Sequence, residues 1–81
     1  MTAYEKDMLK IQDLQQEIAS LQSYVTNLET EYRVVTDQYM EGVVTADVGK
    51  YQNKLKRERD RALKHIENKS TQLRRLVQKY S

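Results

Sequence analysis

The chain of 81 residues has no cysteine, proline, tryptophan or phenylalanine, and its two glycines are Gly42 and Gly49. Without cysteine, neither a disulfide framework nor a thiolate metal site is possible. Neither glycine belongs to a glycine-rich phosphate-binding loop, because no Gly-Lys-Ser or Gly-Lys-Thr follows. The absence of proline, with 32% charged and 38% hydrophobic residues, is typical of long helices rather than of a compact globule or a disordered tail.

Long apolar runs are also missing from the sequence. No stretch approaches the roughly 20 apolar residues that a membrane-spanning helix needs, so we expect no association with membranes. The first seven residues are polar and do not resemble a secretory signal. We therefore expect a cytoplasmic protein, although export without a leader is compatible with the same sequence.

Two stretches of the chain repeat apolar side chains in steps of three and four residues. This spacing puts them on one stripe of a helix and is the pattern of a coiled coil. It predicts a single domain with helices over about 3–40 and 47–79, joined by a connection at about 41–46 in which Gly42 ends the first helix. The expected seam between the helices comprises Ile11, Leu14, Ile18, Leu21, Val25, Leu28, Tyr32, Val35, Tyr39, Leu55, Ala62, Ile66, Leu73, Leu76 and Tyr80.

The two seams match each other in antiparallel order, which predicts an all-α, two-helix hairpin. Facing positions, such as Leu28 with Ala62 and Leu14 with Leu76, have residue numbers that add to 90 or 91 along the whole length. This register leaves residues before about position 9 without a counterpart. Charge favours the same pairing, because opposite charges attract. Residues 1–49 have three basic and nine acidic side chains, a net charge of −6, whereas residues 50–81 have eleven basic and three acidic side chains, a net charge of +8.

Two basic residues, Arg59 and Lys69, interrupt the seam of the second helix. We expect the Arg59 guanidinium to stack on Tyr32 and to reach a carboxylate of Glu29 or Glu31. Long basic side chains at a seam usually extend their charged ends to solvent, and we expect this of Lys69. The alternative is that both point outward to a ligand.

Two helices side by side bury one stripe each and cannot enclose a core. Further apolar residues beside the seam predict contacts with additional helices, in a four-helix bundle formed either by two copies or with a partner chain. The candidate partner-binding residues are Leu9, Val34, Leu63 and Val77.

The second helix also carries a continuous basic stripe, with steps of four and three residues. Such a stripe could contact nucleic-acid phosphates at every turn without reading sequence. The alternatives are that it faces the acidic first helix or is simply solvated, and the net charge of only +2 weakens the nucleic-acid interpretation. The stripe comprises Lys50, Lys54, Arg57, Arg61 and Lys64.

Catalytic chemistry is not indicated by the sequence. His65 is the only histidine and has no neighbouring ligand or nucleophile, so we interpret it as a residue at the edge of the seam. A two-helix hairpin lacks the concave apolar pocket that small-molecule chemistry requires. We therefore expect a non-enzyme with no cofactor, no metal and no small-molecule substrate.

The layout of about 40 helical residues, a glycine-containing bend and about 35 helical residues resembles the WXG100 superfamily. It is most similar to the small helical partners encoded beside LXG toxins of type VII secretion systems. The residues that carry this resemblance are Tyr4-Glu5, Ile11, Ile18, Leu21 and Leu28 in the first helix and Gly42, Ala46 and Tyr51 around the bend.

At the bend, residues 39–42 do not form a W-x-G motif, and no tyrosine near the C-terminus is followed four residues later by Asp or Glu. The resemblance therefore implies a toxin-associated partner or chaperone that packs against a toxin's helical N-terminal region, rather than the exported signal-bearing subunit. A structural or scaffolding coiled coil is a further alternative.

Overall fold

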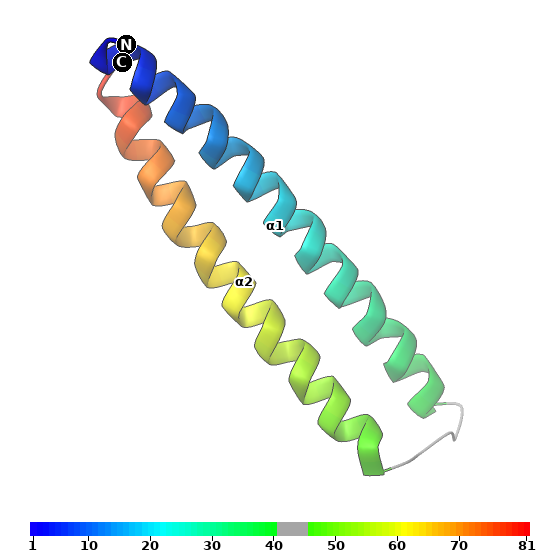
Figure 1. The fold of residues 1–81 in the computed structure, drawn as a ribbon. Helices are drawn as coiled ribbons and strands as arrows, with labels where there is room; N and C mark the ends of the chain where they lie inside the picture. The colour runs from blue at the N-terminus through cyan, green and yellow to red at the C-terminus, as the bar shows by residue number, and fades with distance from the viewer. Residues whose placement is uncertain (41–45) are drawn as a thin grey trace.

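The computed structural model describes residues 1–40 and 46–81, and the side chains of 1–38 and 47–81. Helix α1 spans Ala3–Met40 and helix α2 spans Ala46–Gln78. They run antiparallel along their whole length, so that the two chain termini lie together at one end (Figure 1). The described residues contain no strand, and the all-α hairpin predicted from the heptads is confirmed.

Local chemistry explains how α1 begins and stays regular. The backbone N–H of Glu5 donates a hydrogen bond of 3.1 Å to the Thr2 hydroxyl, which caps the helix start, and Glu5 itself suits the positive end of the helix dipole. Threonines inside the helix donate their hydroxyls to the carbonyl four residues earlier, as Thr26 does at 3.0 Å and Thr30 at 2.9 Å. Their polar groups are therefore satisfied within the helix.

The core of the hairpin is a single narrow seam. All five buried hydrophobic side chains of the described residues come from the stripes singled out in the sequence: Leu14, Val25, Leu28, Leu55 and Ala62. Eight further residues of the expected seam are half-buried, namely Ile11, Ile18, Leu21, Tyr32, Val35, Ile66, Leu73 and Leu76. Tyr80 is exposed, and the side chain of Tyr39 lies outside the described residues. The molecule measures 60 × 20 × 14 Å, so it is one layer of helices thick.

The register of the hairpin differs from the expected one by about one helical turn. For residues in contact across the seam, the two residue numbers add to 82–88 and not to the expected 90 or 91. The sum is 82 for Tyr24 with Glu58 and 88 for Gln52 with Thr36. The observed register agrees with the ends of the helices. Because α1 ends at Met40 and α2 begins at Ala46, positions at one level add to about 86.

The shifted register gives the first residues of α1 a partner, and the expectation that they have no counterpart is wrong. The Tyr4 ring packs edge-on against the ring of Tyr80, with centroids 5.2 Å apart. Asp7 also contacts the end of the chain through Lys79 and Tyr80. The hairpin is therefore closed at the end where the termini meet.

Candidate functional site

One side of the seam is marked by two reciprocal tyrosine–glutamate contacts. The Tyr24 hydroxyl of α1 donates a hydrogen bond of 3.2 Å to Glu58 of α2, and the Tyr51 hydroxyl of α2 donates one to Glu31 of α1. Each helix thus has a tyrosine followed seven residues later by a glutamate, and the antiparallel arrangement joins the two pairs crosswise. We call this side, with Tyr24, Glu31, Tyr51 and Glu58, the tyrosine flank.

Charged side chains lie close to the partly buried phenol of Tyr24 on the tyrosine flank. Partial burial, followed by the negative charge of Glu58 and the hydrogen bond to it, raises the pKa of the Tyr24 phenol. Nearby, the Lys69 ammonium lies 2.6 Å from a Glu17 carboxylate oxygen. Lys69 therefore reaches from the seam to an acidic partner on α1 at the surface.

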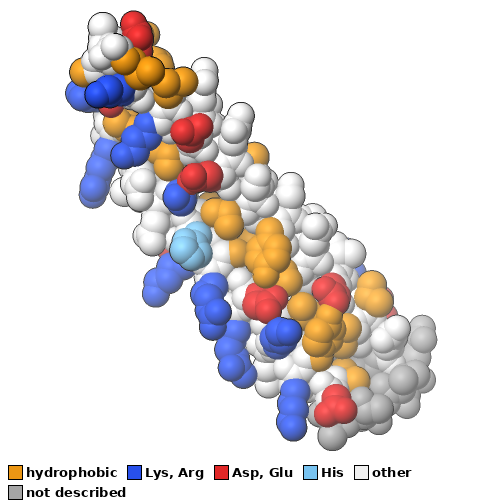
Figure 2. Space-filling model, in the orientation of Figure 1, with side chains coloured by type: hydrophobic (Ala, Val, Ile, Leu, Met, Phe, Trp, Pro, Cys, Tyr) orange, Lys and Arg blue, Asp and Glu red, His pale blue; other side chains and the backbone are white. Residues whose placement is uncertain are grey.

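Two grooves run along the tyrosine flank and share Leu21 and His65. The larger, of about 660 Å³, has Leu21 at its apolar part and carboxylates of Asp13 and Glu17 at its rim. The smaller, of about 280 Å³, lies beside Tyr24. In Figure 2 hydrophobic side chains gather on this face next to the pale-blue histidine. His65 is thus at the edge of the seam and lines a groove, which sequence reasoning did not anticipate.

The four candidate partner-binding residues are all exposed in the single chain. The exposed fractions are 48% for Leu9, 51% for Val34, 45% for Leu63 and 48% for Val77. Leu63 directly follows the buried Ala62, on the side of α2 away from His65, and we call this side the Leu63 flank. What binds these residues stays a prediction.

Arg59 is only partly placed as expected. It lines a groove with Glu29 and Tyr32, but the cation over the Tyr32 ring is Lys56, with its Nζ 5.5 Å from the centroid. The guanidinium of Arg59 instead contacts Asp60, the next residue, at 3.4 Å. Its Nε is buried without a hydrogen-bond partner. Arg59 is therefore the least satisfied polar side chain of the described seam.

The basic stripe lies on the exposed surface of α2, outside the seam. All five of its residues are exposed, and among the described residues none of them forms an ion pair. Basic side chains line the outer edge of α2 in Figure 2. Arg61 lines the smaller groove with Leu21 and Tyr24 of α1, and the exposed stripe is available to solvent or to a ligand.

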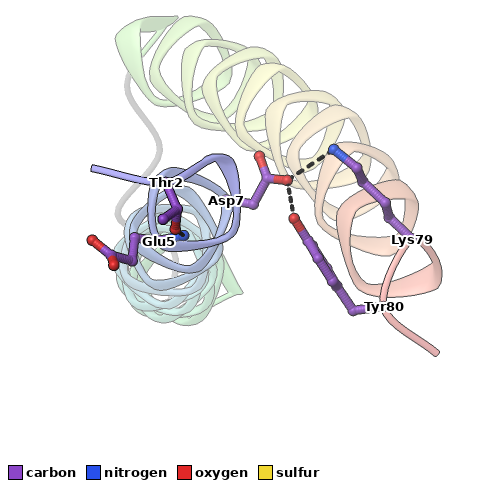
Figure 3. A network of polar contacts seen from close by, with 5 residues as sticks. All are labelled: Thr2, Glu5, Asp7, Lys79 and Tyr80. Atoms are coloured by element: carbon purple, nitrogen blue, oxygen red, sulfur yellow. Dashed lines mark hydrogen bonds and ion pairs between the residues drawn. The ribbon is translucent and has the colours of Figure 1, made fainter.

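A group of polar contacts joins the two helices at the end where the chain termini meet (Figure 3). The Asp7 carboxylate accepts a hydrogen bond from the Tyr80 hydroxyl and lies 2.9 Å from the Lys79 ammonium. The hydrogen bond from Tyr80, followed by that from Lys79, lowers the pKa of Asp7. In return, the bond to Asp7 raises the pKa of Lys79 and of Tyr80. We call these three residues the terminal clasp.

Residues 1–40 and 46–81 contain no group of three His, Asp or Glu side chains placed to hold a metal ion. Neither described helix has a stretch long and apolar enough to cross a membrane. Comparison with protein-family models, with curated proteins and with solved structures found no match to the chain.

Proposed function

We propose that this protein is a non-enzymatic interaction module that packs its helices against other helices, from a second copy or from a partner chain. The proposal rests on a comparison of how many hydrophobic side chains are exposed and how many are buried. Among the residues whose side chains are described, nine large hydrophobic side chains are exposed, whereas five hydrophobic side chains are buried. Helices with apolar residues on more than one side are those with more than one neighbour.

The experiment is a double substitution on the Leu63 flank, Leu63→Asp with Val77→Asp. We expect the double variant to lose its complex with a helical partner chain, which light scattering measures as the loss of the partner's mass. Circular dichroism should remain largely helical, because neither side chain is buried in the hairpin. Retention of the complex by the double variant would remove these residues from the interface.

A narrower proposal concerns the identity of the partner. The resemblance to the helical partners of LXG toxins leads us to propose a toxin-associated partner or chaperone that covers a toxin's helical N-terminal region. Such a region, co-expressed with this chain, should co-purify at fixed stoichiometry and lose this association in the double variant. Absence of a complex with any LXG N-terminal region would contradict this narrower proposal and leave the wider one standing.

A second candidate is a nucleic-acid-binding hairpin, favoured by the exposed position of the basic stripe. Its affinity should fall steeply with salt, because phosphate contacts release counterions. Changing Lys54, Arg57 and Arg61 to Glu should abolish binding of short RNA or DNA at low salt. Binding that is absent from the wild-type chain at low salt contradicts this candidate.

A further inference from the structure

We propose that a second copy of the chain covers the tyrosine flank, with α1 of each copy lying against α2 of the other in an all-antiparallel four-helix bundle. This inference rests on the proposed function and specifies its partner and its surface. The tyrosine flank offers two connected grooves and the exposed rings of Tyr24 and Tyr51. The dimensions and charges of the tyrosine flank favour a second copy of the chain as its partner.

The charges of the helices select the arrangement of the two copies. Helix α1 has three basic and seven acidic residues, net −4, and α2 has ten basic and four acidic residues, net +6. A two-fold axis across the helices would place α1 against α1 and α2 against α2, so that like charges meet. A two-fold axis along the helices places each α1 against the α2 of the other copy, and opposite charges meet.

A two-fold axis along the helices also leaves each residue at the same height along the bundle, so residues at one level in the hairpin are at one level between the two copies. Asp13 lines the larger groove and Arg61 the smaller, and Arg75 lies two heptads beyond Arg61 on the same edge of α2. Positions at one level add to about 86 in the hairpin, so Asp13 comes opposite Arg75 of the second copy. By the same rule, Glu31 comes opposite Lys54 and the Tyr24 ring opposite Arg61.

Apolar groups match as well. Val34 and Tyr51 are 51% and 37% exposed and lie at one level, so each would cover the other across the two-fold axis. A face of 60 by 20 Å is large enough for a standard interface, which buries about 800 Å² per partner. The second copy therefore complements the tyrosine flank in length, charge and apolar contacts.

The test is charge reversal with complementation in trans. Asp13→Arg and Arg75→Asp each place two pairs of like charges in the homodimer, and each should weaken dimerisation at least about tenfold. Mixed one to one, the two variants form a heterodimer in which both pairs are again opposite in charge. Light scattering of the mixture at about 100 µM should recover the wild-type dimer mass.

Matched controls lie on the other edge of α2. Glu67→Arg and Arg74→Asp make the same charge changes on the side of Leu63 and should leave the wild-type dimer intact. A wild-type chain that is monomeric at this concentration, or a mixture that does not dimerise, overturns the inference. A dimer that resists both reversals but is lost with Leu63→Asp and Val77→Asp also overturns it, and in that case the proposed function stands. A wild-type chain that associates with neither itself nor any helical partner contradicts both.

Discussion

The two helices share one seam but contribute to it in different ways. The described seam of α1 is apolar or aromatic from Ile11 to Val35 and supplies three of the five buried side chains. The seam of α2 includes Gln52, Arg59 and Lys69, of which Gln52 and Lys69 make polar contacts to α1. Helix α1 therefore holds the hairpin mainly by burial, whereas α2 combines burial with polar links and displays basic charge outward.

The largest expected effect on stability is the loss of a buried side chain of α1, which we compare with the loss of a polar link of α2. Leu28→Ala in α1 removes a side chain that is 6% exposed and should cost about 2–5 kcal/mol of unfolding free energy. Lys69→Ala in α2 removes a partly exposed ion pair and should cost at most about 1 kcal/mol. Urea unfolding followed by circular dichroism measures both. Equal losses of unfolding free energy in the two variants would contradict the different roles assigned to the two helices.

A smaller effect, of opposite sign, is expected at Arg59. Arg59→Met removes the buried Nε that has no partner and keeps an unbranched side chain in the seam, so it should stabilise the hairpin by about 1 kcal/mol. Arg57→Met, on the exposed stripe, is the matched control and should change stability by less than about 0.5 kcal/mol. Destabilisation by Arg59→Met would show that the guanidinium has a partner in solution.

The reciprocal tyrosine–glutamate contacts predict a pattern of coupling between exposed residues. Tyr24→Phe and Glu58→Ala should each lower the melting temperature slightly, and the double variant should lose less than the two losses together, because both remove the same hydrogen bond. Tyr24→Phe with Glu31→Ala should be additive, since those residues belong to different contacts. Absence of coupling between Tyr24 and Glu58 would mean that the helices pair in another register.

The smallest expected effect is the pH dependence of the terminal clasp. The pKa of Asp7 is lowered by its hydrogen bonds from Tyr80 and Lys79, so its stabilisation is complete above the unfolded value of about 3.9 and is lost as pH falls through the lower folded value. The raised pKa of Lys79 and Tyr80 gives stabilisation below about pH 10 that is lost at higher pH.

Asp7→Asn is the variant that tests this dependence. Its melting temperature should be lower than that of the wild type at pH 7, and the difference should shrink on acidification below about pH 4. Glu5→Gln, at the same end of the chain but outside the clasp, is the control. A difference between wild type and Asp7→Asn that stays constant from neutral to acidic pH would contradict the role of the carboxylate.

The sequence predicts the helices and the stripe that faces inward, because heptad spacing decides both. The level at which the helices meet was not predicted, since apolar residues one turn apart are nearly equivalent in the heptad pattern, and the observed register is the one that agrees with the helix ends at Met40 and Ala46. A usable signal was present in the shared spacing of Tyr24 with Glu31 and of Tyr51 with Glu58. In the observed register these four residues pair crosswise, whereas the predicted register separates them.

Contacts that depend on side-chain reach were harder to predict. Lys56 and Arg59 both lie within reach of Tyr32, and position along the helix does not decide which cation covers the ring. The terminal clasp was missed for a simpler reason, because the predicted register left Asp7 beyond the end of α2. The exposure of the basic stripe follows from the seam itself, since helical spacing places its residues outside the stripe of α2 that contains Leu55 and Ala62.

The most direct test of the account is the molecular mass and melting temperature of the wild-type chain over a wide range of protein concentration. If the hairpin is one layer of a larger helical assembly, sedimentation equilibrium should show a dimer, and the melting temperature should rise with concentration. A monomer at every concentration that is fully helical and melts cooperatively at one fixed temperature would contradict the central claim, that a second copy of the chain completes the helical bundle.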